Sequence, residues 1–182
     1  MKNKLFIIIA SIAMASCAAK AETPVYTVTA EGVGPITLGT EISALPSSCD
    51  GLYDRIDTRT EINEWEDPYT YYVAYSGDEI VCEIYEWNGR VTSAKIVSPR
   101  VATESGLTCH STVHDIFAAG GSVEVSNDGA LSMVCDSVRF EVGGLTDGGR
   151  QKVLQAYYGK ECKFTEADFA AGADAMAIIV ME

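Results

Sequence analysis

Apolar and polar residues alternate most clearly in the middle of the chain, where they predict three neighbouring β-strands. Residues 69–75 and 79–87 are rich in aromatic and β-branched side chains, and a short polar turn separates them. Asn88 and Gly89 tolerate positive φ and make a two-residue hairpin turn, which leads into a third strand within residues 90–98. We therefore expect an antiparallel meander here.

A second run of elements follows. Thr112 and Asp115 have the spacing of a capping box, and the apolar positions after them predict a short helix over residues 112–119. Beyond the helix, residues 123–125 and 131–142 predict a hairpin that continues the sheet.

The two runs resemble each other. Residues 36–45 align with residues 107–116: in both, a β-prone residue precedes a polar or glycine corner, a hydroxyl residue and apolar residues three apart. We therefore predict an α+β fold in a single domain over residues 32–182. Two related halves, about 32–98 and 99–182, build one curved antiparallel sheet with short helices on one face.

The remaining expected elements are less regular. They are a helical turn at 41–45, a strand at 51–60, an acidic loop at 61–68, helices at 150–158 and 166–171, and a buried apolar strand at 175–181.

The first 21 residues have the pattern of a signal peptide. Lys2 and Lys4 precede an apolar stretch that is too short to be retained as a membrane span. Residues 14–17 form an imperfect lipobox ending at Cys17, which would carry the lipid; the alternative is ordinary cleavage after Ala21. Residues 22–31 would then be a tether or an edge strand. Either route predicts a bacterial envelope protein: an outer-membrane lipoprotein, or a periplasmic or secreted protein.

Charge narrows the choice of partners. Cleavage after Ala21 removes three lysines and no acid, and so takes the formal net charge from −13 to −16. Such a surface repels phosphate backbones and anionic headgroups, so we expect no nucleic acid partner, and contact with the membrane only through a lipid anchor.

Five cysteines remain after Cys17. An oxidising compartment favours disulfides, and the odd number leaves one thiol over. We prefer pairs within each half, with Cys162 as the free thiol, although the connectivity stays open. The four candidates are Cys49, Cys82, Cys109 and Cys135.

Four segments carry a family resemblance. In order, they are residues 32–36, 90–99, 111–121 and 137–142. They resemble the blocks of the YfeY-type family of enteric outer-membrane lipoproteins, whose function is unknown, so the resemblance implies no active site. The strand–helix–hairpin unit is also similar to the repeat of the β-lactamase-inhibitor-protein fold, which the small lipoprotein of the outer-membrane barrel-assembly machine shares. Here His110 replaces the usual glycine before the helix, and the segment after Val142 is longer.

The resemblance to that fold implies binding of proteins. Four aromatic residues on the predicted meander are our candidates for a partner-binding surface: Tyr69, Tyr71, Tyr85 and Trp87. The sequence lacks a Gly-x-Ser-x-Gly motif, and both histidines belong to one short helix. We therefore expect a non-catalytic protein without a cofactor that binds a protein or another envelope component.

A metal-binding protein is the alternative. His110 and His114 are four residues apart at a helix start, and Cys109 precedes them, so they offer nitrogen and sulfur ligands for zinc or copper.

Overall fold

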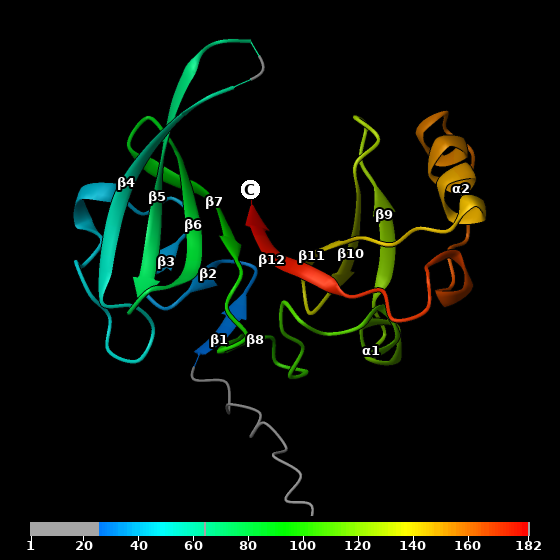
Figure 1. Cartoon of the computed structure of the whole chain (residues 1–182), viewed down its shortest axis with the longest axis horizontal. Coiled ribbons are helices and arrows are strands. Elements are labelled where there is room, and N and C mark those ends of the chain that lie inside the picture. Colours follow the sequence, from blue (N-terminus) through cyan, green and yellow to red (C-terminus); the bar gives the residue numbers. More distant parts are fainter. Residues whose placement is uncertain (1–25, 64, 182) are drawn as a thin grey trace, which may run out of the picture.

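The computed structural model describes residues 26–63 and 65–181, and an eight-stranded antiparallel sheet dominates it (Figure 1). The order of strands is β4-β5-β6-β7-β12-β11-β10-β9. These strands are β4 (Arg55–Ile62), β5 (Pro68–Ser76), β6 (Glu79–Trp87), β7 (Arg90–Ile96), β9 (Ser122–Val125), β10 (Leu131–Cys135), β11 (Val138–Val142) and β12 (Ala175–Met181). The predicted α+β class and antiparallel sheet are confirmed.

The order divides the sheet into two four-stranded halves. β4–β7 form one meander, β9–β12 form the other set, and β7 pairs with β12 where they meet. A smaller sheet, which the sequence did not predict, has the order β3-β2-β1-β8. Its strands are β1 (Tyr26–Thr29), β2 (Gly32–Val33), β3 (Ile36–Thr37) and β8 (Val101–Ala102).

The two aligned segments occupy equivalent positions. In the first half the amide of Val91, in β7, donates to the carbonyl of Thr40 at 2.9 Å. In the second half the amide of Ala175, in β12, donates to the carbonyl of Ser111 at the same distance. A second matching pair of bonds runs from Ile42 to Gly89 and from Val113 to Ala173, at 2.9 Å each. Each segment therefore docks on the last strand of its own half in the same way.

This equivalence defines a local two-fold axis. If Val91 corresponds to Ala175, then Lys95 corresponds to Ile179, and these two residues are paired across the β7–β12 ladder. A pair that maps onto itself lies on the axis, so the halves are related by rotation about the centre of the sheet.

Alternation along the strands gives the sheet two different faces. One row of paired residues crosses all eight strands on the core side: Ile56, Ala74, Cys82, Ile96, Ile178, Phe140, Met133 and Val123. The neighbouring row lies on the opposite side, here named the open face: Asp57, Val73, Glu83, Lys95, Ile179, Arg139, Val134 and Ser122.

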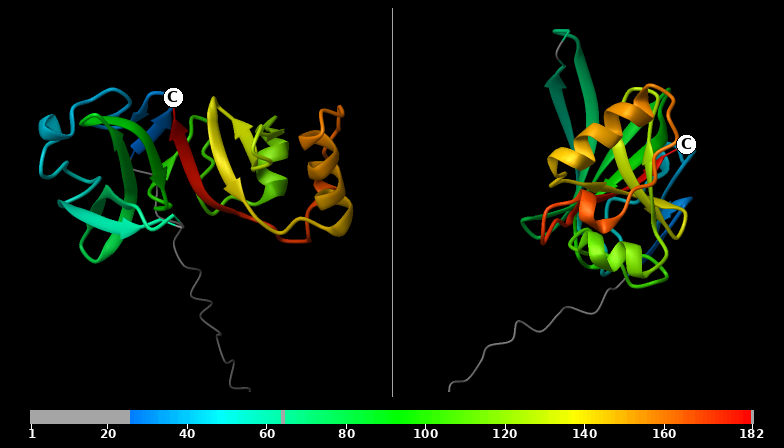
Figure 2. Two further views of the ribbon diagram at one scale, coloured as in Figure 1. Left: turned by 90° about the horizontal axis from the view of Figure 1, so that it is seen from above. Right: turned by 90° about the vertical axis from the view of Figure 1, so that its right-hand side faces the viewer.

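Different elements cover the core side of each half. Over the first half lie Val28, Val33 and Ile36 of the small sheet. Over the second half lie Val113 and Ile116 of α1 (Val113–Ala118). Figure 2 shows α1 under the second half, while α2 (Asp147–Tyr157) stands at the end of the sheet, where it contacts β9.

The helix ends explain one confirmed and one wrong prediction. Thr112 and Asp115 form the expected capping box of α1. α2 begins at Asp147, three residues earlier than expected, because Thr146 caps it and Gly149 does not break it. A Cβ at Gly149 would lie 2.2 Å from the carbonyl oxygen of Asp168, so glycine is needed for close packing. Two expected helices are shorter 3-10 turns, η1 (Ile42–Ala44) and η2 (Glu166–Asp168).

Three strand boundaries also differ from expectation. β4 starts at Arg55 because a turn with Gly51 at positive φ precedes it, and it ends at Ile62, two residues into the expected acidic loop, which connects β4 to β5. The expected strand 131–142 is two strands, since Asp136 and Ser137 both have positive φ and turn the chain. Such a turn without glycine gives a weak sequence signal.

The N-terminal predictions are tested only in part. The signal peptide, the lipobox and residues 22–25 lie outside the described residues. The expected tether or edge strand is instead β1, which lies inside the small sheet between β2 and β8. Within the described residues, every helix is too short or too polar to cross a bilayer.

The position of β12 makes a testable prediction about stability. Ile178 is fully buried between Ile96 and Phe140, so Ile178→Ala should lower the free energy of unfolding by about 2–5 kcal/mol. Met176→Ala, at a half-exposed position of the same strand, should cost less than about 1 kcal/mol. Urea denaturation of both variants measures the difference, and equal losses would contradict the central role of this strand.

Candidate partner-binding face

Three of the four predicted partner-binding residues lie together on the open face. Tyr69 and Tyr71 of β5 stack with ring centroids 5.8 Å apart, and Tyr71 stacks on Tyr85 of β6 at 5.6 Å. Tyr75 and Val73 complete this group, which packs separately from the main core. We refer to the four tyrosines as the tyrosine cluster. The strand alternation predicted from the sequence thus placed the rings on one face.

Two carboxylates hold the tyrosine hydroxyl groups. Glu61 of β4 accepts hydrogen bonds from Tyr69 at 2.9 Å and from Tyr71 at 2.7 Å. Glu83 of β6 accepts one from Tyr85 at 2.8 Å. The bond to Glu61 raises the pKa of Tyr71 to about 12, and the same hydroxyl groups lower the pKa of Glu61. The rings are therefore fixed in orientation, which reduces the entropy lost when a partner binds.

Two arginines close the outer side of the cluster. The guanidinium of Arg55 lies 4.2 Å from the centroid of the Tyr75 ring, and Arg59 donates a 2.7 Å hydrogen bond to the Tyr75 hydroxyl. That bond is the largest cause of the raised pKa of Arg59. Both arginines come from β4, so the edge strand contributes charge and the next strand contributes aromatic surface.

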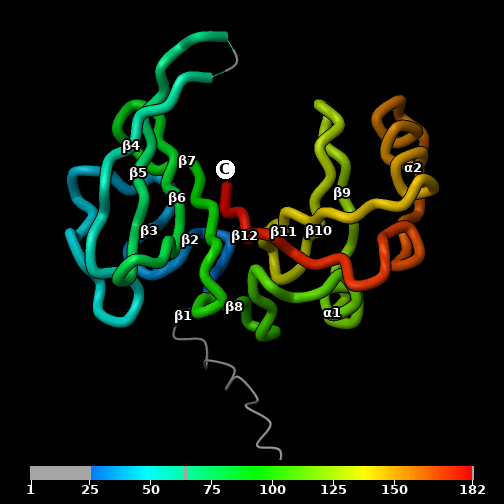
Figure 3. Tube along the Cα trace, in the orientation of Figure 1, coloured from blue at the N-terminus to red at the C-terminus, as the bar shows by residue number. Residues whose placement is uncertain are grey.

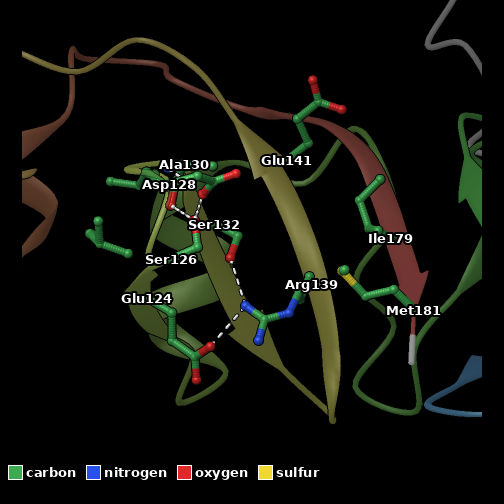
Figure 4. Close-up of a pocket in the computed structure, with 11 residues that line it drawn as sticks. Glu124, Ser126, Asp128, Ala130, Ser132, Arg139, Glu141, Ile179 and Met181 are labelled. Atoms are coloured by element: carbon green, nitrogen blue, oxygen red, sulfur yellow. Dashed lines mark hydrogen bonds and ion pairs between the residues drawn. The ribbon is translucent and has the colours of Figure 1, made fainter. Parts of the chain in front are cut away.

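The second half of the open face carries a groove of about 500 Å³ (Figure 4). Arg139 lies across it and donates to Ser132 at 3.0 Å and to Glu124 at 2.8 Å. Ile179 and Met181 of β12 form its apolar side, and Met181 is half exposed. The groove thus combines an apolar wall with ordered polar groups, as small binding sites commonly do.

An ion pair connects the tyrosine cluster and the groove. Lys95 of β7 and Glu141 of β11 meet at 2.6 Å across β12, beside the two-fold axis. Both side chains are partly exposed, so the pair contributes little stability and holds the centre of the face polar. The open face is therefore continuous from β4 to β9.

Trp87, the fourth predicted residue, does not join the cluster. It ends β6 at the hairpin, pairs with Arg90, and its side chain is 73% exposed. Sequence reasoning also missed the residues that order the face, namely Glu61, Glu83, Lys95, Glu124, Arg139 and Glu141. Only their alternation with core residues along each strand could have placed them on this face. That alternation can be assigned only when the ends of the strands are known.

The predicted metal ligands are not brought together. Cys109 is fully buried in the core, whereas His114 is exposed on α1 and its Nδ1 lies 3.0 Å from a carboxylate oxygen of Glu166. Among residues 26–63 and 65–181, no group of three or more His, Cys, Asp or Glu side chains is arranged to hold a metal ion.

In the described chain Cys49, Cys82, Cys109, Cys135 and Cys162 all carry free thiols, and the preferred pairing within each half stays a prediction. Burial raises the pKa of Cys82 to about 12 and that of Cys109 to about 11, which makes both thiols unreactive. Cys49 lies beside Tyr53, since the amide of Tyr53 donates to the carbonyl of Cys49 at 3.0 Å and the amide of Cys49 donates to the carbonyl of Tyr53 at 2.8 Å.

Thiol labelling distinguishes the two states of the cysteines. If the thiols are free, a maleimide should modify the partly exposed Cys49 and Cys162 first, and Cys82 and Cys109 only after unfolding. Cys162→Ser should remove one of the two fast-reacting thiols, and Cys49→Ser/Cys162→Ser should remove the fast phase. Mass spectrometry of the denatured, unreduced protein gives the number of labelled thiols. Cysteines that react in pairs only after a reductant is added would establish disulfides instead.

The contact between His114 and Glu166 makes a prediction about pH. The hydrogen bond to Glu166 raises the pKa of His114 above 6.5, so the contact stabilises the fold at low pH. That contribution is lost as the pH rises through the raised folded-state pKa. NMR titration should give a pKa above 6.5 for His114 and a lower one in Glu166→Gln, and an unchanged value in that variant would contradict the contact.

Comparison with known proteins supports the fold and leaves the function open. No family model and no curated protein matches the chain. A crystal structure of the uncharacterized protein YfeY from Escherichia coli matches with a TM-score of 0.58; the match covers 86% of this chain and 99% of that one. The two sequences are 16% identical over the match. The chain therefore has a fold similar to that of YfeY.

Proposed function

We propose that this protein is a non-catalytic component of the bacterial cell envelope, held by lipid on Cys17, that binds a protein or cell-wall partner through the open face. The observation that carries the proposal is the tyrosine cluster, whose rings are stacked and whose hydroxyl groups are fixed by Glu61 and Glu83.

The chemistry of the face suits recognition. Tyrosine supplies a large contact area at a low cost in conformational entropy, and it is enriched at the energetic centres of interfaces. Tyr69 retains 37% of its surface in the free protein, and Met181 at the other end of the face retains 53%. A partner that spans both sites would bury these apolar surfaces and cover the ion pair of Lys95 and Glu141, which lies between them.

Several features of the described residues favour binding over catalysis. The titratable groups of the tyrosine cluster satisfy one another through hydrogen bonds, which fixes them in single protonation states at neutral pH. The buried thiols have raised pKa values, the opposite of what a cysteine nucleophile needs. His114 is engaged with Glu166 on the covering helix, away from the open face.

The location in the envelope rests on the first 21 residues. Their basic start, short apolar stretch and lipobox favour export and lipidation. In the lipidated form, which begins at Cys17, two lysines are lost and the formal net charge is −15 (11 − 26). The lipid would supply the attachment to a membrane, because anionic headgroups repel such a domain.

Site-specific photocrosslinking in living cells tests the proposal. A photoreactive phenylalanine analogue placed at Tyr69 and, separately, at Met181 should give adducts with the same partner. The analogue at Tyr158, which is 73% exposed on the surface near the end of α2, serves as the matched control and should not.

Mass spectrometry identifies the adducts and also shows whether Cys17 carries lipid. Equal crosslinking from Tyr158, or none from Tyr69 and Met181, would contradict binding through the open face.

A further inference from the structure

β4 is an edge strand with an unprotected side. Among residues 26–63 and 65–181 it pairs only with β5, whereas β9, the strand at the other edge, is contacted by α2. Figure 3 shows the β4–β5 hairpin extending beyond the rest of the sheet, and its end carries the exposed side chains of Ile62 and Trp65. An exposed edge of eight residues is a template for pairing with another strand.

The backbone groups on this edge can be identified. The amide of Asn63 donates to the carbonyl of Asp67, across the ladder to β5. Since alternate residues of an antiparallel strand bond to the same neighbour, the odd-numbered residues of β4 bond to β5. The even-numbered residues therefore direct their N–H and C=O groups outward. Pro68 agrees with this pattern, because it pairs with Ile62, where β5 has no amide to donate.

The side chains of the odd-numbered residues alternate in charge. Along the open face the order is Arg55, Asp57, Arg59 and Glu61. Edges are commonly protected by charges of one sign, because two copies then repel each other. A strictly alternating order behaves differently, since it can complement itself when a second copy runs in the opposite direction.

One antiparallel register satisfies every charge. If two β4 strands pair about Thr58, Arg55 of each copy lies opposite Glu61 of the other, and Asp57 lies opposite Arg59. Shifting the centre to Asp57 or Arg59 places like charges opposite each other, and parallel pairing in register does the same. The centre at Thr58 also pairs the even-numbered residues, whose backbone groups face outward, with one another.

From this match we propose that β4 pairs with β4 of a second copy of this chain, antiparallel and centred on Thr58, and joins two eight-stranded sheets edge to edge. The charged side chains of β4 are available for ion pairs with the second copy. Glu61 forms no ion pair within the described residues of its own chain, and the Arg55–Asp57 contact is a long 3.5 Å. Arg59 uses one N–H on Tyr75 and keeps others free for a carboxylate.

The end of the β4–β5 hairpin would also contact the second copy. In this arrangement the tip of one hairpin reaches the start of β4 in the other copy. There Asp50, Gly51, Tyr53 and Asp54 line a shallow hollow of about 320 Å³. The interface follows the outer edge of β4 and shares Arg59 and Glu61 with the tyrosine cluster. Self-association and crosslinking at position 58 test this interface, whereas crosslinking from Tyr69 and Met181 to a partner tests the proposed function, so either can fail without the other.

A charge exchange tests the register in solution. The full chain, processed by the cell and studied in density-matched detergent, should show a monomer–dimer equilibrium by analytical ultracentrifugation between about 1 μM and about 1 mM. Arg59→Asp should weaken the association at least about tenfold, since Asp57 of each copy then faces a carboxylate instead of a guanidinium. The double variant Asp57→Arg/Arg59→Asp should restore it. Arg139→Asp, with the same change in net charge elsewhere on the open face, is the matched control and should leave it unchanged.

Cysteine crosslinking tests the centre in whole cells. Opposed residues in a hydrogen-bonded antiparallel pair have Cα atoms about 5.5 Å apart, which suits a disulfide. Under mild oxidation Thr58→Cys should give a covalent dimer, whereas Thr60→Cys faces Ile56 of the other copy and should give only the background of the native cysteines.

A monomer at every concentration would overturn the proposal, as would a dimer indifferent to the charge exchange or equal crosslinking from positions 58 and 60. Crosslinking of Thr58→Cys chiefly to a different protein would show that the edge accepts a foreign strand, and would also overturn it.

Discussion

The pairing of β7 with β12 is the interaction on which the architecture depends. Each half can form its own hydrogen-bonded strands, but only this ladder makes one sheet of eight and aligns the core rows of both halves. Ile96 and Ile178 sit opposite each other at full burial in that ladder, so apolar packing and backbone pairing reinforce each other at the same place. The two-fold relation between the halves then follows from the register.

The same ladder determines where the proposed binding surface lies. Covering elements occupy the core side of both halves, which leaves polar and aromatic residues, with a few aliphatic ones such as Ile179, on the opposite side of the sheet. Because the row through Lys95 and Ile179 is continuous, the tyrosines of the first half and the groove of the second half share one surface. A contact surface of this width is available only because the sheet is not interrupted at its centre.

The sequence was informative where a local rule decides the outcome. The capping box at Thr112, the Asn88–Gly89 turn and the apolar strand β12 were all correctly anticipated from short patterns. The predictions failed where tertiary contacts decide. The helix expected at 150–158 begins earlier, at Asp147, because Gly149 packs closely against Asp168. The first two residues of the expected acidic loop extend β4, where two tyrosines hold Glu61. Neither the order of the strands nor the hydrogen-bond partner of each carboxylate has a local sequence signature. The sequence therefore predicted an aromatic face but not the charged residues that hold it together.

The insertion of β12 between β7 and β11 constrains how the chain folds. Any chain that stops before residue 175 leaves backbone N–H and C=O groups of β7 and β11 unpaired and the two half-sheets unjoined. Until the final strand has been synthesised, both half-sheets therefore resemble the aggregation-prone intermediates for which chaperones exist. Because many contacts join residues far apart in the sequence, we expect folding to be slow and to finish only when β12 pairs. C-terminal tags or fusions would then act on the step that completes the molecule.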